Sequence, residues 1–279
     1  MSDVSGSAVP ESTRLHQALV DQLVQRGYIT TPLIEAAFRA VPRHLFVPDV
    51  PIDRVYQDQY IPTKYEHKQL VSSSSQPAIM AIMLDQLALA PGQRVLEIGA
   101  GTGYNAALMA HLVGPGGHVV TLDLDDDLVC TARAHLSAAG LETVDVIQHD
   151  GALGYALLAP YDRIILTVAS WDIVPAWTAQ LARNGRLVLP LMLFPGLTLT
   201  VAFDWRGDQL QSVSAYPCGF LPLRGELAYP PARDWIAPQI SVAPHPSVQP
   251  PESLTCALEK AWSTMTVTWS LATPASDAA

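Results

Sequence analysis

Short apolar runs alternate with longer helical stretches through the middle of this chain, and that alternation limits the fold more than any other feature. The apolar runs cover residues 94–98, 118–122, 145–147, 163–168 and 186–189, and the helical stretches cover 105–113, 126–139 and 174–182. Strands that alternate with such helices lie parallel, because each helix carries the chain back to the same end of the sheet. The pattern predicts an α/β protein with a doubly wound, mostly parallel sheet covered on both faces.

Two further apolar runs, at 197–205 and 210–216, follow the last helical stretch. The short polar link between them contains Gly207, which suits a tight hairpin turn. An antiparallel pair at one edge would bring the predicted sheet to seven strands.

Two helices are predicted before the sheet. Leu15, Leu19 and Leu23 recur at every fourth residue, which places them on one face of a helix. A second helix is predicted from Pro32, where a missing N–H costs nothing, with Thr31 as its N-cap. Both helices are expected to pack an apolar stripe against a core.

Composition divides the chain into three parts. Residues 1–70 hold a disordered start over 1–12, a helical region, and a polar loop over 56–65. Residues 71–225 hold the predicted sheet, and 226–279 form a proline-rich C-terminal extension. One helix is predicted in that extension from an apolar stripe formed by Leu254, Leu258, Ala261, Trp262 and Met265. This helix either packs back onto the sheet or binds a partner.

Charge and cysteine content exclude several classes of function. The formal net charge of −10 argues against binding to nucleic acid or to an anionic membrane, since both need a basic face. Prolines and charges interrupt the apolar stretches, and the first residues lack the pattern of a signal peptide. Three scattered cysteines favour reduced thiols in a cytoplasmic protein. His44, His67 and His149 lack metal-ligand spacing, so no metal is expected.

A glycine-rich loop follows the first predicted strand. Residues 95–104 read VLEIGAGTGY, so the chain leaves a strand and enters a helix through Gly99, Ala100, Gly101, Thr102 and Gly103. Such a loop lets a ligand lie against bare backbone at the carboxyl edge of the sheet. Asp123 ends the second strand, where a carboxylate can bind ribose hydroxyls, and Asp150-Gly151 ends the third, where an adenine could lie.

The glycine spacing favours a sulfonium cofactor over a dinucleotide. A dinucleotide fingerprint needs a third glycine where this chain has the bulky Tyr104. Glu97, just before the loop, would suit a nearby cation and would repel a pyrophosphate. A nicotinamide-dependent oxidoreductase and a non-catalytic scaffold that binds a partner remain as alternatives.

Four serines precede this loop. Ser72, Ser73, Ser74 and Ser75 are predicted at the positive end of a helix, with Pro77 in its first turn. Their hydroxyls and free N–H groups could bind an anion such as a substrate carboxylate. Alternatively, Ser75 simply caps the helix.

Several motifs follow one another between about residue 14 and residue 226. They are AVPRHLFVP at 40–48, SSSQP at 73–77, the loop at 95–104, YDRIILT at 161–167 and FLPL at 220–223. In this order they resemble the motifs of the protein-L-isoaspartate O-methyltransferase family. By this resemblance, 40–48 matches the N-terminal signature of the family, 73–77 its Thr-Ile-Ser-x-Pro motif, and 95–104 its cofactor loop.

This resemblance implies a class I, Rossmann-like methyltransferase sheet whose last two strands are exchanged. It implies methyl transfer from S-adenosyl-L-methionine to the carboxylate of an isoaspartyl or aspartyl residue in a protein or peptide, leaving S-adenosyl-L-homocysteine. The ester would then collapse to a succinimide (aspartimide). By the match, Ser75 is the active-site serine, and the cofactor contacts are Ser72, Ser73, Ser74, Gly99, Ala100, Gly101, Thr102, Gly103, Asp123, Asp150 and Gly151.

Three departures from the family pattern lie outside the cofactor loop. The stretch at 64–71 lacks the usual glycine, Arg224 replaces a small polar residue, and the chain continues past residue 226. Arg224 is therefore a candidate substrate contact, as is Trp171, for which core packing is the alternative. The extension leaves two substrates open: general isoaspartyl residues, or one aspartate of a ribosomally made, cyclised precursor peptide. The oligomeric state is not predicted.

Overall fold

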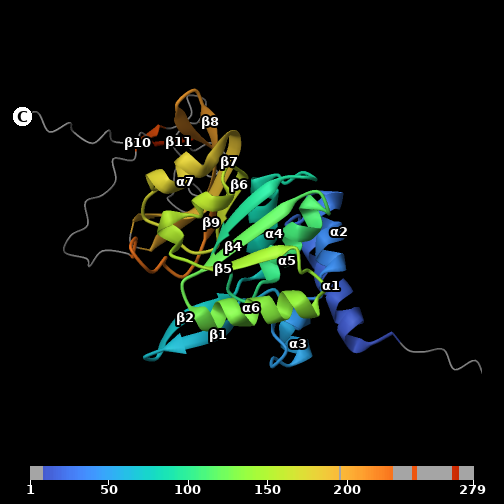
Figure 1. The fold of residues 1–279 in the computed structure, drawn as a ribbon. Coiled ribbons are helices and arrows are strands. Elements are labelled where there is room, and N and C mark those ends of the chain that lie inside the picture. The colour runs from blue at the N-terminus through green and yellow to red at the C-terminus, as the bar shows by residue number, and fades with distance from the viewer. Residues whose placement is uncertain (1–8, 195, 229–240, 244–265, 270–279) are drawn as a thin grey trace, which may run out of the picture.

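One twisted sheet of nine strands runs through the protein in the order β10-β11-β9-β8-β7-β6-β3-β4-β5 (Figure 1). The computed structural model describes residues 9–194, 196–228, 241–243 and 266–269. Five strands are parallel to one another: β3 (Arg94–Ile98), β4 (His118–Asp123), β5 (Val144–Gln148), β6 (Tyr161–Leu166) and β7 (Leu181–Phe194). The predicted α/β fold with a mostly parallel sheet is confirmed.

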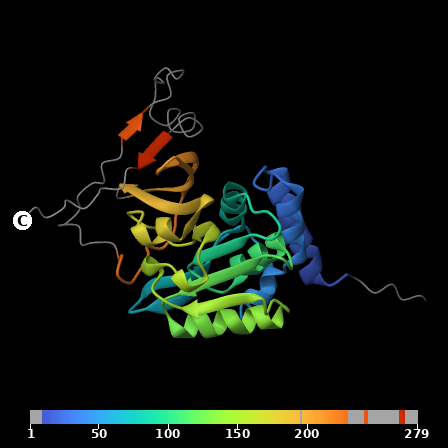
Figure 2. The same cartoon turned by 45° about the horizontal axis from the view of Figure 1, so that its top comes forward.

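Antiparallel strands continue the sheet beyond β7. The predicted hairpin is present as β8 (Leu197–Arg206) and β9 (Gln209–Cys218), so β3 to β9 supply the seven predicted strands. The sixth strand, β8, lies beside the fifth, β7, as the exchanged order requires. Two short strands, β10 (Ser241–Ala243) and β11 (Thr266–Trp269), extend the edge next to β9 (Figure 2).

Both faces of the sheet are covered because successive residues of each strand point to opposite sides. On one face, Val95 and Val119 belong to a core shared with α1 (Glu11–Gln25), α2 (Pro32–Ala40), α4 (Pro77–Leu87), α5 (Tyr104–Val113) and α6 (Asp126–Ala138). On the other face, Leu96 and Val120 pack in a second core with Trp177 of α7 (Pro175–Gln180). The alternation explains why these strands are apolar throughout.

The N-terminal helices are part of the first core. Leu19, Leu23 and Phe38 are buried in the same cluster as side chains of α4 and α5. The Thr31 hydroxyl accepts a hydrogen bond from the Ile34 N–H at 3.3 Å, so the predicted N-cap is confirmed. Helix α1 begins at Glu11, inside the stretch 1–12 that was predicted as disordered.

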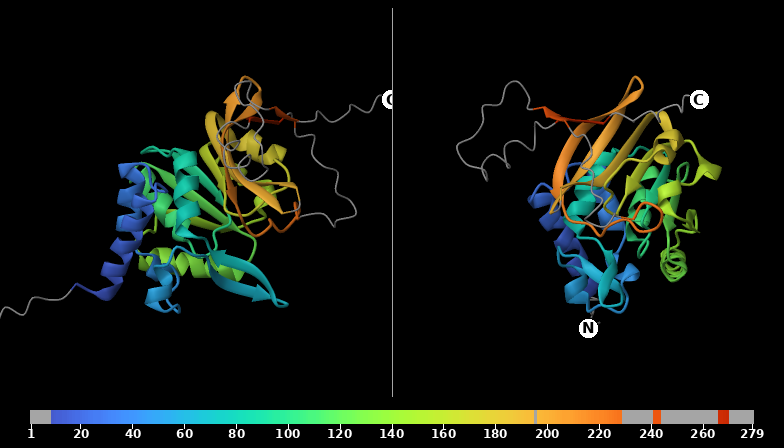
Figure 3. Two further views of the ribbon diagram at one scale, coloured as in Figure 1. Left: turned by 180° about the vertical axis from the view of Figure 1, so that it is seen from behind. Right: turned by 90° about the vertical axis from the view of Figure 1, so that its left-hand side faces the viewer.

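The polar loop predicted over 56–65 is wrong at its end. A short helix, α3 (Ile52–Val55), is followed by a two-stranded hairpin, β1 (Ile61–Glu66) and β2 (Gln69–Ser74), which projects from the sheet (Figure 3). Its turn places His67 at φ +47° and Lys68 at φ +68°. Tight hairpin turns of this kind usually carry Asn or Gly, so His67 and Lys68 do not signal a turn. The predicted boundary between 70 and 71 falls inside β2.

The prediction that Ser75 caps helix α4 is also wrong. Ser72–Ser74 end strand β2, and Gln76 occupies the N-cap position without a side-chain capping bond. Instead, the Asp58 carboxylate accepts a hydrogen bond from the Ala78 N–H at 2.9 Å and another from the Gln76 side chain at 3.1 Å. A residue from a distant loop therefore does the capping. The apolar stripe at 254–265 lies outside the described residues.

Candidate active site

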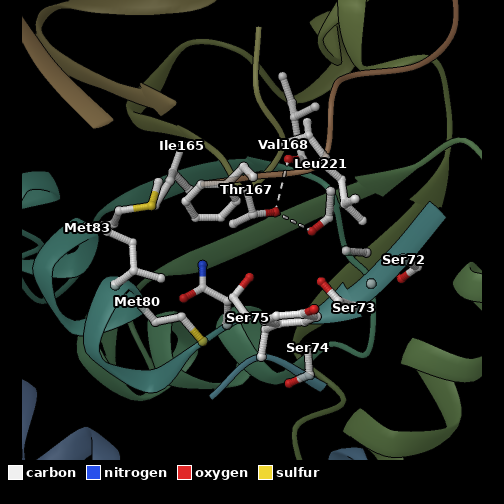
Figure 4. Close-up of a pocket in the computed structure, with 18 of the residues that line it drawn as sticks. Ser72, Ser73, Ser74, Ser75, Met80, Met83, Ile165, Thr167, Val168 and Leu221 are labelled. Atoms are coloured by element: carbon white, nitrogen blue, oxygen red, sulfur yellow. Dashed lines mark hydrogen bonds between the residues drawn. The ribbon is translucent and has the colours of Figure 1, made fainter. Parts of the chain in front are cut away.

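A cavity of about 620 Å³ opens at the carboxyl ends of the parallel strands, where ligands bind in sheets of this type. Figure 4 shows Ser72–Ser75 along one side of it, Met80 and Met83 on another, and Thr167, Val168 and Leu221 opposite the serines. Its lining includes eleven of the predicted site residues, namely Ser72, Ser73, Ser74, Ser75, Gly99, Ala100, Gly101, Thr102, Asp123, Gly151 and Arg224.

Four predicted site residues do not line the cavity: Glu97, Gly103, Asp150 and Trp171. Gly103 is the N-cap of α5, and a Cβ there would lie 3.2 Å from Leu136 Cγ and 3.3 Å from the Ala132 carbonyl oxygen. This glycine therefore allows α5 and α6 to approach each other. Glu97, Asp150 and Trp171 form hydrogen bonds with neighbouring segments of the protein.

Positive φ angles shape the glycine loop. Gly99 and Gly101 have φ values of +107° and +52°, a region that favours glycine. The Thr167 hydroxyl donates to the Gly99 carbonyl oxygen at 2.7 Å, and a Cβ on Gly99 would come within 2.5 Å of that hydroxyl. The loop is consequently fixed between β3 and the residue that follows β6.

Asp123 closes the loop from the end of β4. One carboxylate oxygen accepts a hydrogen bond from the Gly101 N–H at 2.9 Å, and the other accepts from the Leu124 N–H at 2.9 Å. Burial raises the pKa of Asp123 above its ordinary value, although these N–H groups favour the ionised form. The carboxylate is therefore oriented before any ligand arrives and still borders the cavity.

Glu97 is fully buried beneath the loop. Its carboxylate accepts hydrogen bonds from the Thr121 hydroxyl at 2.6 Å and from the Asn105 side chain at 2.8 Å. Burial raises the pKa of Glu97 from 4.5 to about 7. These hydrogen bonds join β3, β4 and α5 beneath the loop.

Asp150 holds the turn after β5 against residues 220–227, here called the closing segment. Its carboxylate accepts from the Ala152 N–H at 2.9 Å and from the Glu226 N–H at 2.8 Å. Trp171 donates from its indole N–H to the Leu227 carbonyl oxygen at 3.3 Å. Both side chains thus fix the closing segment, whose residues Phe220 to Arg224 line the cavity.

Arg224, which lines the cavity, pairs with acidic side chains of the β1–β2 hairpin and of the residues just before α6. Its guanidinium donates to Asp125 at 2.7 Å, and Lys64 of β1 donates to the same oxygen at 2.8 Å. Lys64 also pairs with Glu66 at 3.0 Å and with Asp127 at 2.8 Å. Burial opposes ionisation, but the bonds from Arg224 and Lys64 hold the pKa of Asp125 below its usual range. Two of the three departures from the family pattern, Arg224 and the stretch that begins at Lys64, therefore meet at the start of α6.

The serines differ in their surroundings. Ser72 and Ser74 are buried, and the Ser72 hydroxyl accepts from the Thr63 hydroxyl at 3.0 Å. Within the described residues, no hydrogen bond involves the Ser75 hydroxyl, although the Ser75 carbonyl oxygen accepts from Arg43 at 2.9 Å. Ser75 therefore lines the cavity with a hydroxyl that is free to bind a ligand, while its backbone is held by Arg43.

Other lining residues were not predicted from the sequence. Thr167 follows β6 at the carboxyl edge, a position rule that could have identified it. Tyr28, Met80 and Cys218 come from separate elements and carry no local signal. Burial raises the pKa of the Cys218 thiol to about 12, which favours the protonated form at neutral pH.

The cavity suits a nucleoside cofactor. Its volume is in the range of small-molecule sites, its glycines expose backbone, and Asp123 borders it at the strand end where ribose binds. With the sheet order, these features define a class I methyltransferase that uses S-adenosyl-L-methionine. The family model for protein-L-isoaspartate(D-aspartate) O-methyltransferase matches residues 13–227. The chain belongs to this family.

Relatives and solved structures agree with the family. The protein-L-isoaspartate O-methyltransferase of Hyperthermus butylicus is 39% identical over 219 residues, which cover 76% of this chain and 89% of the relative. The enzyme of that name from Methanoregula boonei is 44% identical over 183 residues, covering 65% and 80%. A solved protein-L-isoaspartate O-methyltransferase is 30% identical with a TM-score of 0.70, covering 76% of this chain and 67% of that one.

A second solved structure shows the fold alone. It is a β-aspartate methyltransferase from Plasmodium falciparum in complex with S-adenosyl-L-homocysteine, and it is 19% identical with a TM-score of 0.66, covering 75% of this chain and 98% of that one.

In the part of the chain that the structure describes, no helix is long and apolar enough to cross a membrane. The same residues contain no group of three or more side chains that could hold a metal ion.

Proposed function

We propose that this protein transfers a methyl group from S-adenosyl-L-methionine to the carboxylate of an L-isoaspartyl residue in a protein or peptide. The observation that carries the proposal is the position of the Ser75 hydroxyl. It borders the same cavity as the glycine loop and Asp123, and it has no hydrogen bond within the described residues. Membership of the isoaspartate O-methyltransferase family supports this choice of substrate.

The chemistry needs alignment more than acid–base help. When bound, the cofactor supplies an electrophilic methyl group, and a new oxygen–carbon bond forms as the carbon–sulfur bond breaks and a neutral thioether leaves. The substrate carboxylate is ionised at neutral pH, so no base has to remove a proton. Ser75 donates a hydrogen bond that orients this carboxylate toward the methyl group.

The two halves of the cavity have different roles in this proposal. Gly99, Gly101, Asp123 and Gly151 hold the nucleoside end of the cofactor, with Ser72–Ser74 beside it. An apolar wall covers the acceptor side, where the substrate peptide would enter, and it is formed by Tyr28, Ile79, Met80, Met83, Tyr216 and Phe220. Arg224 is already paired with Asp125, so we assign it to closing the site rather than to binding substrate.

Mass spectrometry of matched peptides tests the proposal. Peptides that differ only in isoaspartyl or aspartyl linkage are incubated with the protein and S-adenosyl-L-methionine. A gain of one methyl group on the isoaspartyl peptide, followed by loss of methanol as the succinimide forms, is expected. Methylation of neither peptide would contradict the proposal.

The variant Ser75→Ala tests whether the Ser75 hydroxyl orients the substrate carboxylate or only stabilises the fold. Because Gln76 and Asp58, not Ser75, occupy the capping positions, the variant should keep its stability and its affinity for the cofactor. Turnover should fall by about 10- to 100-fold, since a misaligned acceptor loses most of the advantage of proximity. Loss of cofactor affinity with unchanged turnover of the bound complex would contradict the role of Ser75.

The relatives described above carry the isoaspartate name, which favours general isoaspartyl methylation over a dedicated precursor peptide. The precursor peptide is tested in the same assay by adding any peptide encoded beside the gene. We also assign the enzyme to the cytoplasm, on the evidence of its scattered thiols Cys130, Cys218 and Cys256.

A further inference from the structure

Arg43 is the one arginine with no exposed surface among the described residues. It lies in a short 3₁₀ turn, Arg43–Phe46, that joins α2 to the loop before the β1–β2 hairpin. Buried charges are rare unless they are paired or hydrogen-bonded, because burial removes them from water. The position of this guanidinium therefore needs an explanation.

The guanidinium spans two separate segments of backbone. One terminal nitrogen, Nη1, donates to the carbonyl oxygens of Val55 at 3.0 Å and Gln57 at 3.2 Å. The other, Nη2, donates to the carbonyl oxygens of Gln59 at 3.0 Å, Ser74 at 3.3 Å and Ser75 at 2.9 Å. One side chain thus joins the loop at 55–59 to the residues that present the Ser75 hydroxyl.

The same loop holds the chain on the other side of Ser75. Asp58 accepts hydrogen bonds from the Gln76 side chain and from the Ala78 N–H at the start of α4. Ser75 is therefore fixed at its own carbonyl by Arg43 and at the next residues by Asp58. Neither contact uses the Ser75 hydroxyl, which stays directed to the cavity (Figure 4).

The partners of Arg43 are carbonyl oxygens rather than carboxylates. In the described residues its only hydrogen-bond acceptors are these five carbonyls and, at 3.5 Å, the Ser74 hydroxyl. Burial lowers the pKa of Arg43 below its ordinary value, with Tyr104 and Asp58 opposing that effect. An arginine still remains charged at neutral pH. Only a planar fork with several donors can reach both segments together, and a lysine cannot.

We propose that Arg43 is a positioning residue for methyl transfer, because its guanidinium clamps the Ser74 and Ser75 carbonyls to the loop at 55–59 and so sets where the Ser75 hydroxyl points. This inference rests on the proposed role of Ser75. Displacing a reacting group by about 1 Å can lower a rate by about 100-fold, so a clamp on the backbone of Ser75 affects turnover without touching the substrate. The cofactor contacts at Gly99, Gly101 and Asp123 come from other elements and should remain intact.

The variant Arg43→Lys keeps the positive charge and removes the guanidinium group with its two terminal nitrogens. Arg39→Lys is the matched control. Arg39 lies on α2 and pairs with Asp21 and Glu35, away from the cavity. In Arg43→Lys, kcat for an isoaspartyl peptide should fall by about 10- to 100-fold, while the Kd for S-adenosyl-L-homocysteine, measured by calorimetry, changes less than about threefold. Arg39→Lys should match the wild type in both.

A purely structural role is tested by a second comparison. Leu23→Ala removes buried side-chain atoms from α1 in the same core without touching Ser74 or Ser75. If Arg43→Lys and Leu23→Ala lose kcat equally when compared at temperatures where both are folded, the proposal is overturned. Restoration of kcat in Arg43→Ala by added methylguanidinium, with no effect of that ion on Leu23→Ala, would support it.

A measurement on the unaltered protein covers the case in which no Arg43 variant folds. With arginine labelled by ¹⁵N, one set of Nη protons should exchange slowly with water at alkaline pH, since Arg43 alone among the described arginines is buried. If every arginine shows fast-exchanging Nη protons, the clamp does not exist in solution and the proposal fails. Absence of turnover by the wild type on isoaspartyl peptides would instead contradict the proposed function, and this proton signal would be unaffected.

Discussion

Arg224 and Lys64 donate to the same carboxylate oxygen, that of Asp125, at 2.7 Å and 2.8 Å. Arg224 belongs to the closing segment and Lys64 to the β1–β2 hairpin, whereas Asp125 precedes helix α6. Three segments that border the cavity are thereby tied at one atom. Because Asp125 and Lys64 are largely shielded from water, with side chains 15% and 19% exposed, the tie is stronger than an ordinary surface ion pair.

Asp125→Asn should speed the release of the bound cofactor product. Removing the negative charge that Arg224 and Lys64 share weakens both contacts and loosens the closing segment. The expected cost is about 1 kcal/mol, or about a fivefold faster dissociation of S-adenosyl-L-homocysteine. In the wild type, dissociation should accelerate as salt rises from about 0.05 M to about 0.5 M, since salt screens the cluster. Stopped-flow fluorescence measures both effects.

The matched control for that variant is Asp126→Asn. Asp126 is the next residue and is exposed, and its side chain accepts a hydrogen bond from the Cys130 thiol at 4.0 Å. Its removal should leave the dissociation rate and its salt dependence unchanged. Equal effects from the two variants would show that general charge at the start of α6, and not the shared contact, controls release.

Gly99→Ala should disrupt the cofactor loop. A Cβ at this position would come within 2.5 Å of the Thr167 hydroxyl, and φ is +107°. Gly140→Ala is a suitable control, because Gly140 also has positive φ, at +72°, but a Cβ there meets nothing within 4 Å. Both variants should lose about 1 kcal/mol or more of stability to backbone strain. Only Gly99→Ala should weaken cofactor binding, by about tenfold or more as measured by calorimetry.

Asp58→Ala should destabilise the protein through helix α4. The lost acceptor leaves the Ala78 N–H without its capping partner, which typically costs about 1 kcal/mol. Urea unfolding followed by circular dichroism measures the change. Asp58→Asn keeps a side-chain oxygen and should recover most of the stability, whereas Asp53→Ala, at an exposed position on α3, should have no effect. A destabilised Asp53→Ala with an unchanged Asp58→Ala would refute the capping role.

Glu97 makes stability depend on pH. Its pKa is raised from 4.5 in the unfolded chain to about 7 in the folded protein, so between these values the folded state holds a proton that the unfolded state has lost. The favourable contribution is therefore complete below pH 4.5 and is lost as pH rises to about 7, a change of about 3 kcal/mol. Urea unfolding of the wild type across this range should show that slope.

Glu97→Gln should remove this part of the slope. The amide is neutral at every pH and can still bond with Thr121 and Asn105, so the variant should equal the wild type in stability near pH 4.5 and exceed it near pH 8. If the difference in the free energy of unfolding between the two proteins is the same at both pH values, Glu97 does not hold its proton on folding.

Local signals allowed much of the fold to be predicted. The strand at 94–98, the loop after it, and the cap at Thr31 all depend on residues within a few positions of one another. The β1–β2 hairpin was missed because its turn places two consecutive residues other than glycine, His67 and Lys68, at positive φ, which is uncommon. Residue propensities cannot predict a turn whose backbone conformation is imposed by the surrounding structure.

In the site, too, the features that depend on neighbouring residues were predicted and those that depend on distant segments were not. The glycine loop and Asp123 were predicted, because both follow strands that the sequence marks clearly. The contacts that hold the site in place were not predicted. Arg43 bonds to Ser75 from 32 positions away, and Arg224 bonds to Asp125 from 99 positions away. Contacts between distant segments leave no periodic pattern, and a lone arginine is usually a surface residue. The hydrogen bonds that Glu97 and Asp150 accept from the protein were likewise not predicted.

The clamp at Arg43 also limits how far the protein could be shortened. A truncated chain starting at residue 71 would keep the glycine loop and Asp123, and on sequence grounds it would pass for the minimal methyltransferase. It would nevertheless lack the donor to the Ser75 carbonyl and the helices that cover α4 and α5. Such a fragment would expose apolar surface and lose the geometry of its active-site serine. The N-terminal helices are therefore an integral part of the smallest unit that could work, and fusions or deletions should leave residues 11–75 whole.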